Sequence, residues 1–326
     1  MTVTDLLEVR HLKKYYGVSQ SFLLRKTSYV SAVNDVSFTI KEKETLGLVG
    51  ESGCGKSTLG RTILRLLPKT AGEVFFEGRD IENLGSDELR RLRLKMQIIF
   101  QDPYSCLNPR MNVQELVRAP LDIFKLGDKK DRQEKVKEIL NIVGMGPQHL
   151  NRYPHEFSGG QRQRIGIARA LISKPRFVVC DEPVSALDVS VRASVLNLMS
   201  DLQQRFGLTY LFISHDLSVV KHICARVAVM YLGSIIEIAP TEELYLHPLH
   251  PYTQALLSAI PDPYSSSRPQ ILQGDLPSPY NPPPGCRFHT RCPYATEKCR
   301  CQAPPEIDVG CGHKVACHLY CKAANG

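Results

Sequence analysis

One eight-residue stretch carries the strongest chemical signal in this sequence. Residues 50–57 read Gly-Glu-Ser-Gly-Cys-Gly-Lys-Ser, a full match to the phosphate-binding pattern G-x-x-x-x-G-K-[ST]. The glycines let backbone N–H groups turn toward phosphate oxygens, and the start of a following helix attracts the anion. The Lys56 ammonium would reach the β- and γ-phosphates, and the Ser57 hydroxyl would ligate Mg²⁺. The pattern predicts a nucleoside triphosphate site on Gly50, Ser52, Gly53, Cys54, Gly55, Lys56, Ser57 and Thr58.

Two carboxylates follow an apolar run further along the chain. Residues 177–180 (Phe-Val-Val-Cys) are typical of a buried parallel strand, and Asp181 and Glu182 come directly after it. An isolated Asp-Glu pair is usually a solvated turn, but carboxylates at the end of such a strand would lie beside the phosphate loop. Asp181 then suits Mg²⁺, and Glu182 could act as the general base on the attacking water.

Three other positions could take part in the same chemistry. Residues 158–161 (Ser-Gly-Gly-Gln) form a glycine-rich turn that leads into a helix, a second place where an anion could bind. Gln101 follows an expected strand over 97–100. His215 follows an apolar run over 208–214, although a lone histidine is more often structural.

The elements that must position these residues can be read from periodicity. Alternation over 7–12 and 33–40 predicts an N-terminal antiparallel β layer, and residues 225–231 and 234–239 predict a hairpin around Leu232-Gly233. Helical spacing predicts helices over 58–67, 86–96 with Ser86 as its cap, 131–143 and 191–206. The sequence therefore predicts an α/β protein.

Composition narrows the possible functions. The chain has 326 residues, 43% hydrophobic and 23% charged, as expected for a globular protein. No apolar run is long enough to span a membrane and no secretory signal is visible, so we expect a cytosolic protein whose membrane association comes through a partner. The net charge of +8 includes no dense basic tract, which favours a solvated surface over a nucleic-acid site.

Cysteine and proline set the C-terminal part apart. Seven of the 11 cysteines lie in residues 286–321, and 11 of the 22 prolines lie in residues 261–305, a stretch that should contain no regular helix or central strand. In a reducing compartment, clustered cysteines indicate a metal more than disulfides. Zinc, with histidines among its ligands, and an iron–sulfur cluster remain open on composition alone. The candidate zinc partners are His289, His313 and His318.

The order of these motifs resembles that of an ATP-binding cassette (ABC) ATPase over the first 240 or so residues, and the 158–161 signature is nearly specific to that superfamily. The resemblance implies the ABC nucleotide-binding fold: a parallel core sheet around the phosphate loop, an antiparallel β layer and a helical signature subdomain. It implies that Tyr16 stacks on adenine, with adjacent Tyr15 leaving this assignment ambiguous by one residue. It also implies that Gln101 senses the γ-phosphate and Mg²⁺, that 185–188 crosses a dimer interface, and that His215 is a catalytic switch. The nucleotide-contacting signature residues are Ser158, Gly159, Gly160 and Gln161.

The C-terminal segment, residues 244–326 (the tail), resembles the C-terminal extension of peptide/nickel importer ATPases. The resemblance rests on His-Pro-Leu-His-Pro-Tyr-Thr at 247–253 and Gly-Cys-Arg-Phe-His-Thr-Arg-Cys-Pro at 285–293. We therefore expect an ABC cassette at 1–243 and a small Cys/Pro-rich extension at 244–326. Some of these importers carry a [4Fe–4S] cluster, which implies one here; Cys301, Cys311 and Cys321 depart from the family pattern and are taken as non-ligands. The implied ligands are Cys286, Cys292, Cys299 and Cys317.

The same resemblance implies the partners. Such ATPases work as head-to-tail dimers on the cytoplasmic face of the membrane with two permease subunits, fed by an extracytoplasmic solute-binding protein. A second related ATPase is favoured as the dimer partner, with a homodimer left open. The transported solute stays open among dipeptides, oligopeptides, nickel chelates and glutathione. The alternative is a nucleic-acid-directed ABC ATPase with a zinc-binding tail; only 102 positions separate Lys56 from Ser158, which leaves no room for the usual long insertion.

Overall fold

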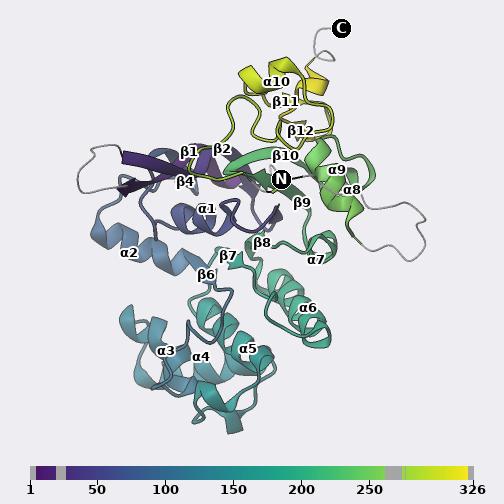
Figure 1. Ribbon diagram of the computed structural model, residues 1–326. Coiled ribbons are helices and arrows are strands. Elements are labelled where there is room, and N and C mark those ends of the chain that lie inside the picture. The colour runs from purple at the N-terminus through teal and green to yellow at the C-terminus, as the bar shows by residue number, and fades with distance from the viewer. Residues whose placement is uncertain (1–4, 20–26, 261–273, 276, 322–326) are drawn as a thin grey trace. The chain divides into compact units, whose positions relative to one another are not determined.

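The structure is a computed structural model that describes residues 5–19, 27–260, 274–275 and 277–321. The chain divides into two compact units (Figure 1). Unit 1 comprises the described residues within 1–41, 45–82 and 214–326. Unit 2 comprises residues 42–44 and 83–213.

Unit 1 begins with the antiparallel layer that the alternation predicts. The strands lie in the order β2-β1-β4-β5, and Val9 of β1 pairs with Phe38 on one side and Val74 on the other. These three side chains are buried, which is why the apolar residues alternate along each strand. The strand bounds are β1 (Asp5–Ser19), β2 (Thr27–Lys41), β4 (Ala71–Phe76) and β5 (Arg79–Asp80).

A second group of strands in unit 1 leads into the phosphate loop. Strand β3 pairs in parallel with β9, and β9, β10, β12 and β11 follow one another as antiparallel neighbours. All five residues of β3 are buried, as a strand covered on both faces requires. The predicted hairpin is β9–β10, and both turn residues have positive φ, Leu232 at 42° and Gly233 at 85°. The bounds are β3 (Thr45–Val49), β9 (Arg226–Tyr231), β10 (Ser234–Pro240), β11 (Ile307–Asp308) and β12 (Lys314–Val315).

The helices of unit 1 are short. Helix α1 starts at Lys56 and ends at Ile63, four residues earlier than the apolar spacing predicts, because the chain turns at Arg65 with a φ of 51°. The proline-rich stretch contains one short helix, α10, in its proline-free part, contrary to expectation; residues 261–273 lie outside the described part. The bounds are α1 (Lys56–Ile63), α7 (Leu217–Ile223), α8 (Thr241–Leu246), α9 (Pro251–Ser258) and α10 (Glu297–Cys301).

Unit 2 holds the parallel strands β6, β7 and β8 in that order, with β7 and β8 fully buried. Helices α3, α4 and α5 pack together in it, which is the predicted helical subdomain (Figure 1). Helix α2 starts at Ser86, but its cap is Gly85, whose N–H donates to Glu88 Oε2 at 3.2 Å. The bounds are β6 (Met96–Ile99), β7 (Phe177–Asp181), β8 (Thr209–Ile213), α2 (Ser86–Lys95), α3 (Val113–Ile123), α4 (Lys129–Ile142), α5 (Gly159–Leu171) and α6 (Val189–Phe206).

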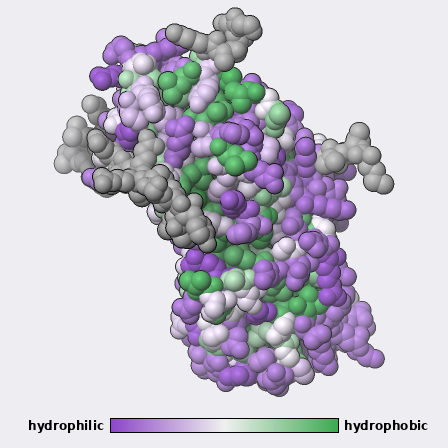
Figure 2. Space-filling view, turned by 90° about the vertical axis from the view of Figure 1, so that its right-hand side faces the viewer, coloured by the Kyte–Doolittle hydropathy of each residue, from purple (hydrophilic) through white to green (hydrophobic). Residues whose placement is uncertain are grey.

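The surface is mostly hydrophilic on the face shown in Figure 2, with smaller hydrophobic patches between the polar side chains. Among the residues that the structure describes, Val189 is the most exposed large apolar side chain, at 80%, and it lies where α6 begins. Within the described part of the chain, no helix combines the length and the apolar character that crossing a membrane would need.

Candidate functional site

The phosphate loop of unit 1 joins buried strand β3 to helix α1. Three of its glycines have positive φ, Gly50 at 150°, Gly53 at 80° and Gly55 at 109°. Residues that carry a side chain rarely adopt these backbone angles. A Cβ on Gly55 would lie 2.0 Å from the Ala32 carbonyl oxygen, so only glycine fits there. The β9–β10 turn supports the loop from outside, because the Gly233 N–H donates to the Cys54 carbonyl at 2.8 Å.

Lys56 is folded onto the loop in this structure. Its Nζ donates to the carbonyl oxygens of Gly50 at 2.8 Å and Glu51 at 2.9 Å, and the residue is only 4% exposed. The neighbouring Cys54 is buried, and burial raises the pKa of its thiol, so it remains uncharged beside the ammonium. The loop therefore holds one cation at the start of α1.

The helix start fits a polyphosphate. Its N-cap, Gly55, has no side chain to accept from the first amides of α1, and its first turn contains no acidic residue. The donor set is a lysine ammonium, a serine hydroxyl and the helix N-terminal amides, which no N-cap side chain occupies; this is the chemistry that binds a nucleotide's phosphates. The loop residues present thus fit ATP with Mg²⁺.

Two further predicted residues belong to unit 1. Tyr16 is 36% exposed, with the Lys14 ammonium 4.6 Å from its ring centroid, whereas the Tyr15 hydroxyl is tied to Asn34 Oδ1 at 2.8 Å. The Ser214 N–H donates to the Leu48 carbonyl of β3 at 3.1 Å, so the following residue, His215, lies beside the strand that leads into the phosphate loop. His215 is exposed there.

Unit 2 brings together three predicted residues. Strand β7 ends at Asp181, which is 1% exposed, and Glu182 follows it with a φ of 47°, an unusual backbone conformation of the kind found at functional sites. Gln101, which follows β6, donates from Nε2 to Glu182 Oε2 at 2.9 Å. The predicted γ-phosphate sensor and the predicted base are therefore in direct contact.

The signature turn stands at the N-terminus of α5 in unit 2. Ser158 caps the helix: its Oγ accepts from the Gln161 N–H at 3.4 Å, while the Ser158 N–H donates to Gln161 Oε1 at 3.1 Å. Gly160 is buried, and a Cβ there would lie 2.3 Å from Val191 Cγ1 of α6. Ser158 and Gly159 are exposed, so this helix N-terminus is open to an incoming anion.

Comparison with known proteins identifies the chain. Residues 33–185 match the ABC transporter family, and residues 236–299 match the oligopeptide/dipeptide transporter C-terminal region. The chain is 54% identical over 320 residues to the "Oligopeptide transport ATP-binding protein AppF" of Bacillus subtilis (strain 168), and the matched region covers 97% of each chain. The chain belongs to the ABC transporter family. It is an ABC-type ATPase with the C-terminal region of the oligopeptide/dipeptide transporters.

Other relatives agree with this assignment. This ABC ATPase is 54% identical over 319 residues to the "Putative peptide import ATP-binding protein BOV_A0347" of Brucella ovis, which covers 97% of this chain and 98% of the relative. Its fold matches the ATP-binding cassette MJ0796 bound to ADP and Pi, with a TM-score of 0.64 and 28% identity over 72% of this chain and 98% of that one. The predicted ABC ATPase fold is confirmed, and none of these comparisons supports the nucleic-acid alternative.

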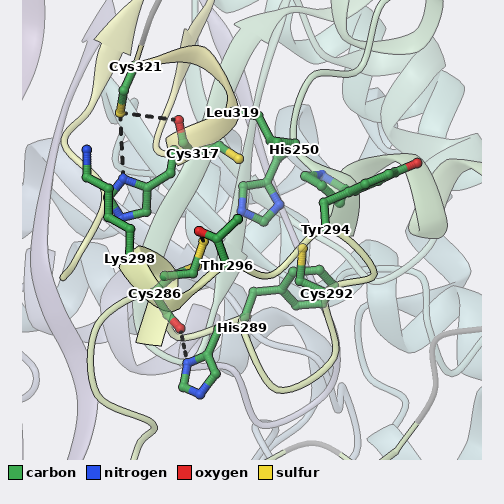
Figure 3. Close-up of a pocket in the computed structure, with 14 residues that line it drawn as sticks. His250, Cys286, His289, Cys292, Tyr294, Thr296, Lys298, Cys317, Leu319 and Cys321 are labelled. Atoms are coloured by element: carbon green, nitrogen blue, oxygen red, sulfur yellow. Dashed lines mark hydrogen bonds between the residues drawn. The ribbon is translucent and has the colours of Figure 1, made fainter. Parts of the chain in front are cut away.

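The iron–sulfur prediction for the tail is wrong. Among the residues that the structure describes, no group of three or more His, Cys, Asp or Glu side chains is arranged to hold a metal ion. The four expected cluster ligands, Cys286, Cys292, Cys299 and Cys317, instead line a cavity of about 460 Å³ (Figure 3). The zinc alternative loses its support by the same observation.

The cysteines of this cavity lie in different environments. Burial raises the pKa of Cys286 and Cys292, and raises that of Cys317 to about 11. The Cys299 sulfur, for its part, lies 3.3 Å from Thr296 Oγ1 in a hydrogen bond. Counting cysteines does not reveal these environments.

The tail of this ABC ATPase is instead held by a buried carboxylate on β10. The Glu237 side chain accepts from the Leu249 N–H at 2.7 Å, the His250 N–H at 3.0 Å and His313 Nε2 at 2.8 Å. Strand β12 pairs with β10 at the same place, where Glu237 faces Val315. Sequence analysis missed Glu237, because an acidic residue in an apolar strand gives no local sign of partners 12 to 76 positions away.

Acid should weaken this attachment through His250. Its ring is 1% exposed and its Nδ1 accepts from the Tyr252 N–H at 3.1 Å, capping α9; burial lowers the pKa of His250 to about 4, while the Glu237 charge opposes that shift. The unfolded chain therefore takes up the proton first, and stability is lost as the pH falls from about 6.5 toward 4, by about 1.4 kcal/mol per pH unit.

The matched variant is His250→Asn, whose side-chain oxygen can still cap α9 but cannot titrate. Urea unfolding at pH 7, 6 and 5, followed by circular dichroism, should show a shallower acid slope for His250→Asn than for the parent. Identical slopes would mean that His250 does not govern the acid response.

Proposed function

We propose that this chain is the ATP-hydrolysing subunit of an importer of di- or oligopeptides. The observation that carries the proposal is the 54% identity to an oligopeptide transport ATP-binding protein across 97% of both chains, which includes the tail as well as the cassette. The oligopeptide/dipeptide transporter C-terminal region at residues 236–299 supports the same substrate class.

Each site residue has a defined task in this proposal. Lys56 and the α1 amides hold the β- and γ-phosphates, Ser57 and Asp181 hold Mg²⁺, and the exposed Tyr16 ring receives adenine. The bound Mg²⁺–ATP supplies the phosphoryl group that water attacks. Glu182 accepts the proton of that water, and Gln101, already hydrogen-bonded to Glu182, orients the water.

The remaining residues complete the reaction across a dimer. His215 would contact the γ-phosphate, and the signature turn, exposed at Ser158 and Gly159, would place its helix N-terminus against the nucleotide of a second ATPase subunit. A related ATPase is the favoured partner and a second copy is the alternative. ATP closes the dimer and hydrolysis reopens it, which drives two membrane permeases at the cytoplasmic face, with an extracytoplasmic binding protein presenting the peptide.

Uptake by cells tests the transport assignment. Replacing the chromosomal gene by the Glu182→Gln variant should abolish uptake of a radiolabelled tripeptide or dipeptide, while uptake of a free amino acid stays unchanged. The exposed Glu138→Gln substitution on α4 is the matched control and should leave peptide uptake intact. Normal peptide uptake in cells whose Glu182→Gln protein is present at the parental level would contradict the proposal.

A further inference from the structure

The tail reaches the phosphate loop itself. Arg291 forms a two-pronged ion pair with Glu51, the second residue of the loop pattern, with Nη1 2.8 Å from Oε2 and Nη2 3.1 Å from Oε1. The hydroxyl of Tyr252 accepts from the Glu51 backbone N–H at 2.9 Å. Both tail residues thus act on Glu51, one through its carboxylate and the other through its amide.

These two contacts come from a buried part of the tail. Tyr252 is fully buried, its ring centroid 4.7 Å from that of Tyr231 and 5.5 Å from that of Phe288, both edge-on. The Arg291 side chain is 7% exposed, against 27% for Glu51. A hydroxyl and a guanidinium anchored in this way impose their geometry on the loop rather than following it.

A second tail arginine reaches the loop through the β9–β10 turn. The Arg287 guanidinium donates to the Leu232 carbonyl, and the next residue, Gly233, donates to the Cys54 carbonyl of the loop. The phosphate loop is therefore supported at Glu51 and at Cys54 by hydrogen bonds that lead back to residues 252–291.

The charge of Glu51 makes the ion pair important for nucleotide binding. A carboxylate in a loop that takes a triphosphate repels its ligand unless a cation neutralises it. Lys56 binds the Glu51 carbonyl and is assigned to the phosphates, whereas Arg291 binds the Glu51 carboxylate. A bidentate guanidinium also fixes the direction of the carboxylate, which a single ammonium would not.

We propose that Arg291 and Tyr252 are positioning residues for the ATPase reaction: Arg291 neutralises and orients Glu51, and Tyr252 fixes its amide, so that the C-terminal tail sets the affinity of the phosphate loop for ATP. The inference rests on the assigned role of this loop in ATP binding. The tail then has a task in the nucleotide cycle in addition to any contact with partner subunits.

Equilibrium ATP binding to the full chain, measured by isothermal titration calorimetry, tests the proposal. Arg291→Met should weaken ATP binding by about 10-fold at low salt. The loss should be smaller at high salt, because salt screens the repulsion between the unneutralised Glu51 carboxylate and the phosphates of ATP. Arg291→Lys should recover part of the loss. The double variant Glu51→Gln/Arg291→Met should bind ATP as tightly as Glu51→Gln does, since no carboxylate is left to neutralise. The exposed Arg300→Met substitution in the tail is the charge-matched control and should leave affinity unchanged.

Tyr252→Phe keeps the buried ring and removes only the hydroxyl, so it tests the proposal even if Arg291→Met does not fold. It should weaken ATP binding by about 3- to 10-fold, the equivalent of one hydrogen bond. Parental affinity in a folded Arg291→Met protein, or an equal loss in the double variant, would overturn the electrostatic role. Parental affinity in Tyr252→Phe would overturn the role of the hydroxyl. Those outcomes leave the ATPase assignment standing as long as Lys56→Ala strongly weakens ATP binding, whereas a parent chain that binds no ATP would overturn both.

Discussion

We expect the Glu182→Gln substitution to reduce ATP turnover by about 100-fold or more, the usual effect of removing a general base, while ATP binding persists. The side chain keeps its size, and its amide oxygen can still accept from Gln101 Nε2, which lies 2.9 Å from Glu182 Oε2 in the parent. Only the ability to accept the proton of water is lost. Phosphate release by the chain assembled with its partner subunits measures the effect.

The control for this substitution is Glu138→Gln, the same chemical change at an exposed position of α4 in the same unit. It should leave turnover at the parental value. A Gln101→Ala substitution, which removes the contact with Glu182 but keeps the base, should lower turnover less than Glu182→Gln does. If the order of these effects were reversed, Gln101 and not Glu182 would be the more important residue.

The Lys56→Ala substitution should weaken ATP binding itself by about 100-fold, since it removes the positive charge that binds the β- and γ-phosphates. It also removes the hydrogen bonds from Lys56 to the loop. The Lys56 ammonium donates to the Gly50 and Glu51 carbonyl oxygens, so the loop loses part of its shape as well. Calorimetric titration with ATP gives the affinity. A melting temperature equal to that of the parent would show that the substitution acts locally and does not unfold the protein. An unchanged affinity for ATP would refute the role of Lys56.

Local patterns predicted most of the fold. Strand β7 was expected at 177–180 and occupies Phe177–Asp181, and helix α4 was expected at 131–143 and occupies Lys129–Ile142. The pattern was less reliable at element ends, where one backbone angle decides: α1 stops before the left-handed Arg65, although Leu66 and Leu67 continue its apolar spacing. Periodicity reports which face is buried and not where a turn begins.

Long-range contacts and protonation could not be predicted in this way. The Glu51–Arg291 ion pair joins residues 240 positions apart, and the Glu237–His313 pair joins residues 76 apart. No spacing rule links such positions, because the fold alone brings them together. The cluster prediction failed for a related reason: the sequence gives the number of cysteines in the tail, whereas the fold decides whether their side chains are arranged around one point, and among the described residues none are arranged to hold a metal ion.

The identity of the nucleotide retained by the assembled protein tests the central claim most directly. Parent and Glu182→Gln proteins, each assembled with partner subunits, would be incubated with ATP and Mg²⁺, separated from free nucleotide, and their bound nucleotide analysed by chromatography. The assignment of Lys56 to binding and Glu182 to hydrolysis predicts unhydrolysed ATP on Glu182→Gln and mostly ADP on the parent. ADP on both proteins in equal amounts would contradict it.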